Sequence, residues 1–318
     1  MKHAPLILAL LALTACESNS DIVNQWMNPD KTFSKFEQPD VPTMDNTIEK
    51  QAQAALEAGD MKRAGQFYEQ LLDSKKTSKA DKLRYRTVLS DMLRRTGQYE
   101  KALKQFNVVL KEDPENIDAL EGKGLTQMAL GKSADAGRTL SKVLDKDGKR
   151  WRTLNALGIL FVTKNMIPEA MEYFTEGLRV DTDNPAILNN VGLARAIEKN
   201  YPRSIETLQQ AAKVSPSDNR KKQIELNLAL VYGISGDLES AKAMAEKHLD
   251  GATLDNNLGL YSHLAKNDEL AKTYLNMALT SSPTFYERAW NNLDIITEQS
   301  NPDTKANPYG RAKSVPIR

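Results

Sequence analysis

Residues 151–184 read WRTLNALGILFVTKNMIPEAMEYFTEGLRVDTDN, and the pattern of this stretch recurs along most of the chain every 34 residues. Three columns repeat at that period and two prolines stand three periods apart: Gly124, Gly158 and Gly192; Ala102, Ala136, Ala170 and Ser204; Phe106, Leu140, Phe174 and Leu208; and Pro114 with Pro216. Because independent columns share one period, the sequence predicts a stack of similar units rather than one closed core.

Each unit reads as two antiparallel helices, A and B. Ala170 and Phe174 are four residues apart, so they lie on the same face of helix B. The pair Leu157-Gly158 in helix A leaves room for a neighbouring helix. A turn of the form Gly-x-aromatic, as at residues 97–99, joins the two helices, and a proline after helix B ends it because proline cannot donate a backbone hydrogen bond.

These residues and their period resemble the tetratricopeptide repeat (TPR). The resemblance implies an all-α fold, a right-handed superhelical solenoid of about seven helix pairs plus a capping helix. The small residue of helix B places the units at 45–82, 83–116, 117–150, 151–184, 185–221, 222–251 and 252–285, with 286–297 as the capping helix. The solenoid is expected over 45–297, followed by a mobile polar tail over 298–318.

Composition excludes several classes of function. The 43 basic and 42 acidic residues among 318 give no basic excess for a nucleic-acid partner. One cysteine excludes an intramolecular disulfide and a thiolate zinc site, and neither His248 nor His263 has a second ligand at helical spacing. Gly131-Lys132-Ser133 is no phosphate loop, because Thr126 stands where that motif needs glycine. We expect no enzyme, cofactor, metal or small-molecule substrate.

The first residues read as a targeting segment. A short basic start precedes an apolar run that is too short to span a bilayer. Leu13-Thr14-Ala15-Cys16 resembles the bacterial lipobox, which implies a signal peptide over 1–15, a lipidated Cys16 and a flexible tether over 16–44. The alternative is an ordinary signal peptide followed by a chance cysteine. Glu17, where an aspartate would imply inner-membrane retention, implies an outer-membrane anchor facing the periplasm.

Position six of helix A suggests a partner-binding groove. Along the array this column holds Val88, Gly122, Ala156, Asn190, Asn227, Asn257 and Asn291. An asparagine amide offers one donor group and one acceptor to a peptide backbone, so a ladder of them could hold an extended segment, with Asn189 and Asn256 adding further amides. The alternative is that asparagine is simply common in TPR A helices.

The N-terminal half of the array offers charged side chains instead. Arg84, Asp91 and Arg94 occupy positions two, nine and twelve of one A helix, which suggests a charged end of the same groove. The alternative is an ordinary solvated helix face.

The C-terminal half carries a further resemblance. Residues 224–232 read IELNLALVY, and a shortened unit then leads to Asn256-Asn257-Leu258-Gly259. This is similar to TadD, the TPR lipoprotein of tight-adherence (Flp) pilus systems. The resemblance implies assembly of the pilus apparatus with an outer-membrane secretin or another pilus component as protein partner. The alternatives are a type IV pilus pilotin, another TPR lipoprotein of envelope assembly and, more distantly, an enzyme.

Overall fold

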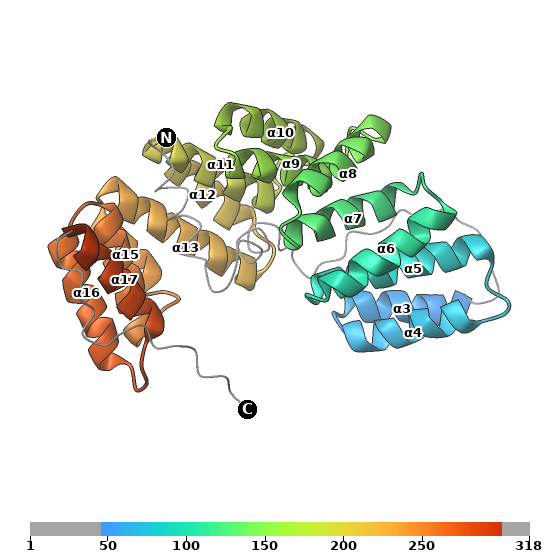
Figure 1. Ribbon diagram of the computed structural model, residues 1–318, viewed down its shortest axis with the longest axis horizontal. Coiled ribbons are helices and arrows are strands. Elements are labelled where there is room, and N and C mark those ends of the chain that lie inside the picture. Colours follow the sequence, from blue (N-terminus) through green and yellow to red (C-terminus); the bar gives the residue numbers. More distant parts are fainter. Residues whose placement is uncertain (1–45, 301–318) are drawn as a thin grey trace. The chain divides into compact units, whose positions relative to one another are not determined.

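The computed structural model describes residues 46–300, and every regular element in that range is an α-helix. The predicted signal peptide, Cys16, the tether and residues 301–318 lie outside the described residues. Figure 1 shows α3 (Asn46–Glu57), α4 (Met61–Asp73), α5 (Lys79–Arg95), α6 (Tyr99–Glu112), α7 (Ile117–Ala129), α8 (Ser133–Lys146), α9 (Trp151–Thr163), α10 (Ile167–Val180), α11 (Pro185–Ile197), α12 (Tyr201–Val214), α13 (Asp218–Ser235), α14 (Leu238–Ala245), α15 (Gly251–Leu264), α16 (Asp268–Ser281) and α17 (Glu287–Ser300). The predicted all-α fold of seven helix pairs and a capping helix is confirmed.

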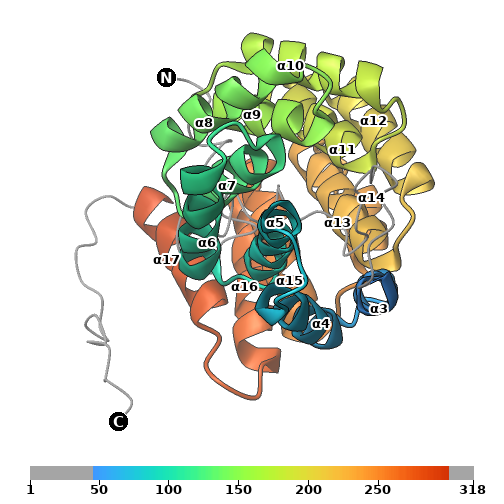
Figure 2. The same cartoon turned by 90° about the vertical axis from the view of Figure 1, so that its right-hand side faces the viewer.

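The chain forms two compact units, and their boundary falls within α13, after Ile224. In the first unit each of the five pairs from α3 to α12 packs helix on helix, and α4, α6, α8 and α10 also contact the first helix of the next pair. The first helices contact one another as well, since α5 meets α7, α7 meets α9 and α9 meets α11. Figure 2 shows α10 and α12 on the outer side of α9 and α11.

The turn within each pair requires a left-handed residue. Gly97 and Gly131 adopt φ of 78° and 71°, and Asn165 and Lys199 occupy the same column one and two periods later with φ of 60° and 63°. The backbone N–H of Lys132 bonds the carbonyl of Gln127, which closes the end of α7. Gly131-Lys132-Ser133 is therefore the turn between α7 and α8.

The repeated columns form the interior of the stack. Helix B contributes one small residue per pair, and all of them are fully buried: Ala64, Ala102, Ala136, Ala170, Ser204, Ala241 and Ala271. A side chain at Gly124 would lie 2.6 Å from the Leu140 side chain, and one at Gly192 would lie 2.6 Å from Leu208. The glycine column thus allows the close approach of the two helices in each pair.

The second unit ends with α17 as a cap. Ala289 and Ile296 of this helix are buried against Ala271, Leu275 and Ala278 of α16, so the last pair does not expose its apolar face. The helix runs to Ser300, three residues past residue 297, where the capping helix was predicted to end.

Two helices begin four residues earlier than the unit boundaries at 83 and 222 predict. The Ser78 hydroxyl accepts a hydrogen bond of 3.0 Å from the N–H of Asp81 and caps α5 at Lys79. The Ser217 hydroxyl accepts a bond of 3.4 Å from the N–H of Arg220 in the first turn of α13. The residues just before these two boundaries therefore form the first turns of α5 and α13.

Candidate functional site: a charged cavity between α5, α7 and α9

The first unit contains a cavity of about 580 Å³ in which charged side chains of both signs meet. It is lined by Thr87, Asp91 and Arg94 of α5, Phe106 of α6, Asp118, Glu121, Gly122 and Leu125 of α7, and residues around the start of α9, namely Asp147, Lys149, Arg150, Trp151 and Arg152. The first helices of three consecutive pairs supply most of these residues, because those helices contact one another directly.

Asp91 is held between two arginines of its own helix. Arg94 Nε donates to one carboxylate oxygen at 2.8 Å, and Arg95 Nε donates to the other at 2.6 Å. Burial by itself would raise the pKa of Asp91, but Arg94, Arg95 and the more distant Arg152 hold it well below the usual range. Asp91 is therefore an anion at any pH near neutrality, and it neutralises only part of the surrounding positive charge.

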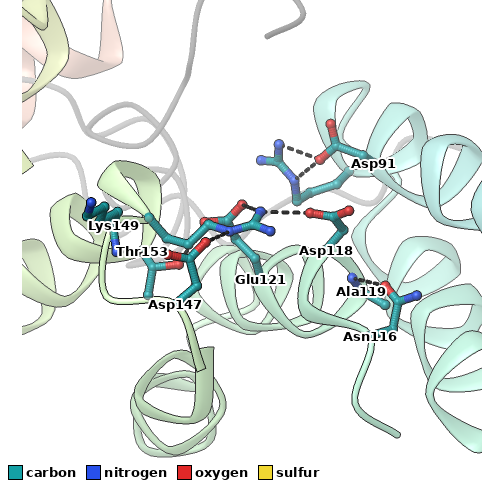
Figure 3. Close-up of polar contacts among 10 residues, drawn as sticks. Asp91, Asn116, Asp118, Ala119, Glu121, Asp147, Lys149 and Thr153 are labelled. Carbon is teal, nitrogen blue, oxygen red and sulfur yellow. Dashed lines mark hydrogen bonds and ion pairs between the residues drawn. The ribbon is translucent and has the colours of Figure 1, made fainter. Parts of the chain in front are cut away.

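Arg150 organises the opposite side of the cavity. Its Nη1 lies 2.7 Å from Asp118 and 3.6 Å from Glu121, and its Nε lies 3.0 Å from Asp147 (Figure 3). Burial would lower the pKa of Arg150, but these carboxylates outweigh it and the pKa is raised. One guanidinium thus joins α7 to the segment that enters α9, using the fork of donors that only arginine provides.

Glu121 is fixed by a second contact. Its Oε1 accepts a hydrogen bond of 2.7 Å from the Thr153 hydroxyl, and both residues are buried. The same α9 turn carries Arg152, whose guanidinium carbon lies 5.3 Å from the centre of the Trp151 ring. Burial lowers the pKa of Arg152, while Glu121 opposes that shift.

A small residue keeps the cavity open. A side chain at Gly122 would overlap the ring of Phe106, so only glycine allows α7 to pass so close to α6. Lys149 stands at the edge of the charged cluster, on the side away from Asp91 (Figure 3). Its side chain is exposed, and its backbone N–H donates 3.0 Å to Asp147.

The chemistry of this cavity favours binding over catalysis. Asp91, Arg94, Asp118, Glu121, Asp147 and Arg150 form ion pairs with one another or with Arg95. A polar segment of another protein could exchange its own charged or amide groups for those pairs. Within residues 46–300 no group of His, Cys, Asp and Glu side chains has an arrangement suited to a metal ion. In the same range no helix has the length and apolar content needed to cross a bilayer.

Of the three residues predicted to form a charged end of the groove, the structure brings only two together. Asp91 and Arg94 both line the cavity. Arg84 instead faces α3, where it pairs with Glu49 at 2.6 Å, and the Tyr85 hydroxyl donates to the same carboxylate at 2.8 Å. Arg84 therefore joins the first two helix pairs to each other.

The prediction of groove-facing amides is wrong for Asn190, a member of the asparagine ladder, and for Asn256, one of the two amides expected to add to it. Asn190 is fully buried, and its Nδ2 donates 2.8 Å to Oδ1 of Asn155 while its own Oδ1 accepts 3.2 Å from Asn189. Asn256 is 5% exposed and accepts 3.0 Å from Asn292. These amides pack between consecutive first helices instead of facing an open groove, because each bonds an asparagine of the neighbouring first helix.

The remaining asparagines lie nearer the surface. Asn227 is half-buried and takes part in contacts within the protein. Asn257 is half-buried and donates 2.8 Å to the Thr253 carbonyl of its own helix, while Asn291 is exposed. A role for these three side chains in partner binding stays a prediction.

Sequence reasoning did not single out Asp118, Glu121 or the segment Arg150-Trp151-Arg152. A signal was present in the repeat itself. Glu121 stands at position five, where the next two units have Asn155 and Asn189. A carboxylate in a column of amides, with an arginine about one repeat later, indicates an ion pair between successive first helices.

Comparison with known proteins supports the fold. Residues 93–157 match the tetratricopeptide repeat family. The chain is similar to a TPR protein from Parabacteroides merdae, with 18% identity, 80% of this chain and 98% of that chain covered, and a TM-score of 0.55. It is also similar to PilW, described as a widely conserved type IV pilus biogenesis factor, with 19% identity, 66% and 98% covered, and a TM-score of 0.56. At these identities the likeness concerns the fold.

A curated relative shares only part of its length with this chain. The auxiliary subunit NAA15 of the N-terminal acetyltransferase A complex of Arabidopsis thaliana is 30% identical over 122 residues, which is 38% of this chain and 14% of that protein. The helix pairs, the 34-residue columns and these similarities define an all-α TPR solenoid, a fold that binds other proteins.

Proposed function

We propose that this protein is a lipid-anchored TPR scaffold of the bacterial outer membrane that faces the periplasm and assists assembly of a tight-adherence (Flp) pilus secretion apparatus. Its partner is an outer-membrane secretin or another component of that apparatus. The lipid on Cys16 would hold the solenoid near the membrane, which raises its effective concentration toward a partner there.

The charged cavity between α5, α7 and α9 is the observation that supports binding of a partner most directly. It combines a volume of about 580 Å³ with Asp91 of α5, Arg152 of α9 and Arg150 directly before α9, and α5, α7 and α9 contact one another in sequence. Charged groups of both signs favour a polar protein segment and select its register through complementary charges.

A second candidate function is that of a type IV pilus pilotin. The likeness of the fold to PilW, a type IV pilus biogenesis factor, favours this candidate. Both candidates place the protein at the base of a pilus, and they differ in the pilus that depends on it. Deletion of the gene should remove surface pili and multimers of the cognate secretin. Normal piliation of the Flp type in the deletion strain would contradict the first candidate.

Partner binding at the cavity can be tested with one exposed side chain. Lys149→Glu reverses a charge at the rim without breaking a side-chain pair, whereas Lys142→Glu reverses an exposed charge outside the cavity. Crosslinking in cell envelopes should capture less partner with Lys149→Glu than with Lys142→Glu, by about tenfold, equivalent to ~1.4 kcal/mol. Equal capture by both variants would remove the cavity as the binding site.

The anchor has an independent test. Cys16→Ser should abolish labelling by fatty acids and release the protein from the envelope. A wild-type protein that takes no label, together with an equally membrane-bound variant, would contradict lipidation.

A further inference from the structure

The first unit has a second open groove, formed by other helix faces than those of the charged cavity. Its volume is about 760 Å³, and it lies between α8, α9 and α10. Its apolar part includes Leu144 at the end of α8, Leu154 and Phe161 of α9, and Met171 and Tyr173 of α10. Figure 2 shows α8 and α10 on the outer side of this part of the stack.

The aromatic residues of this groove depart from the repeat. Phe161 and Tyr173 stack with ring centres 5.2 Å apart and an angle of 23° between the rings. One period earlier the same two columns hold Gln127 and Thr139, which share a hydrogen bond of 2.8 Å, and one period later Arg195 and Thr207 also bond to each other. Since a polar pair satisfies this position in both neighbouring units, packing of the stack does not require the aromatic pair.

The groove also carries an excess of negative charge. Glu169, Glu172 and Glu176 line it together with one cation, Arg179, which pairs with Glu176. In the described part of the chain neither Glu169 nor Glu172 has an ion-pair or hydrogen-bond partner for its carboxylate.

A cation of this chain already lies close to the aromatic pair. Lys164 Nζ lies 5.5 Å from the centre of the Phe161 ring, and its side chain is exposed. A lysine or arginine from a partner could take the place of this exposed side chain on the ring and meet the two unpaired carboxylates.

We propose that the groove between α8 and α10 is a second docking site, for a partner segment that combines lysine or arginine with apolar side chains. Complementary charge brings the segment to Glu169 and Glu172, and the apolar side chains cover Phe161, Met171 and Tyr173. This site is independent of the charged cavity, so the solenoid could hold two partner segments at once.

Fluorescence anisotropy with a labelled synthetic peptide tests the proposal on the purified full chain. The probe is an eight-residue peptide of alternating lysine and leucine, and the control peptides replace lysine by glutamate or leucine by serine. The lysine–leucine peptide should bind saturably and more weakly at higher salt, and both control peptides should bind at least about tenfold more weakly, equivalent to ~1.4 kcal/mol. No binding of the probe, or equal binding of the glutamate–leucine peptide, would overturn the proposal.

Variants locate the binding. Glu169→Gln with Glu172→Gln should weaken probe binding about tenfold, which is ~1.4 kcal/mol. Glu206→Gln, which changes an exposed glutamate one period after Glu172, should leave binding unchanged. Equal affinity in all three proteins would overturn the proposal.

The aromatic pair Phe161 and Tyr173 can be tested with a double variant that should keep the fold. Phe161→Gln with Tyr173→Thr recreates the Gln127–Thr139 pair of the preceding unit, so helical circular dichroism should be retained. Probe binding should be lost, and unchanged binding would place the site elsewhere. Sedimentation tests whether a second copy of this chain fills the groove instead. If the wild type is a dimer and this double variant is a monomer, the groove is a self-association surface, and the proposed partner is overturned.

Discussion

Asn190 donates a hydrogen bond of 2.8 Å to Asn155, and the two amides are buried between α11 and α9. Comparable polar pairs join other consecutive first helices, namely Tyr85 with Glu49, Thr153 with Glu121 and Asn292 with Asn256. The partners in each pair are between 32 and 36 residues apart. A buried or partly buried hydrogen bond at these interfaces sets the register of one helix on the next, since a shifted helix would leave both groups without their partner.

The amide pair can be tested by a double-mutant cycle. Asn190→Ala should lower the free energy of unfolding by roughly 1–3 kcal/mol, because it leaves the Asn155 carbonyl oxygen buried without its donor. The double variant with Asn155→Ala should cost less than the sum of the two single variants. Urea unfolding followed by circular dichroism measures all three. Asn291→Ala is the control, because that side chain is exposed and its loss should change stability by less than ~0.5 kcal/mol. Additive costs would contradict the pairing.

The repeated position of helix B that holds a small buried residue should not tolerate a large charged side chain. Ala170 is fully buried, so Ala170→Arg should destabilise the first unit by more than about 4 kcal/mol through steric overlap and an unpaired buried charge. Ala134→Arg, at an exposed site of α8, should be nearly neutral. Thermal melts compare the two variants, and a neutral result for Ala170→Arg would contradict the register of the repeat.

A glycine in the turn between α11 and α12 should make the protein more stable. Lys199 adopts a φ of 63°, which strains a residue with a Cβ atom, so Lys199→Gly should raise the free energy of unfolding by about 0.5–1 kcal/mol. Glu198 beside it has a φ of −74°, and Glu198→Gly should instead lower the free energy of unfolding. A higher melting temperature for the first variant and a lower one for the second is the expected result. The same direction of change in both would show that φ does not decide the effect.

The ion pairs of Asp91 should make stability depend on pH. Asp91→Asn leaves Arg94 and Arg95, which are 7% and 8% exposed, without their anion and should cost roughly 3–5 kcal/mol at neutral pH. The pKa of Asp91 in the folded chain lies below its ordinary value of 3.8, so the stabilisation is complete above that pH and is lost as the pH falls towards the folded value. The gap between wild type and variant should therefore narrow below pH 3.8.

Unfolding in urea at neutral pH and at low pH measures this gap. Asp183→Asn, which changes an exposed aspartate, should alter stability by less than ~0.5 kcal/mol at either pH. A cost of Asp91→Asn that is the same at both pH values would contradict the ion pairs.

The helix pairs and the buried columns could be predicted from the sequence because they depend on residue volume. Ala170, Gly158 and Phe174 recur at one period, and a small residue facing a large one has a single workable arrangement between two helices. The beginning of α5 was predicted four residues late, because the cap at Ser78 interrupts no column of the repeat.

The functional surfaces depended on contacts that period alone does not reveal. Asn190 and Asn257 share one column, yet Asn190 is buried against Asn155 and Asn257 is half-buried. Burial of a polar side chain depends on which partner the neighbouring first helix supplies. That helix belongs to another repeat, about 34 residues away in the sequence, so the column alone does not show the partner.

The amino-acid sequence by itself determined that this protein is a stack of paired α-helices with small residues at the crossings, since local periodicity and side-chain volume suffice for that. Only the tertiary structure decided which polar residues hold the stack together and which line a cavity. Asp91, Glu121 and Arg150 come from separate segments, and their approach follows from the way in which α5, α7 and α9 pack. Electrostatic and hydrogen-bond partners depend on distances of a few ångströms between such segments, which only the packed helices establish.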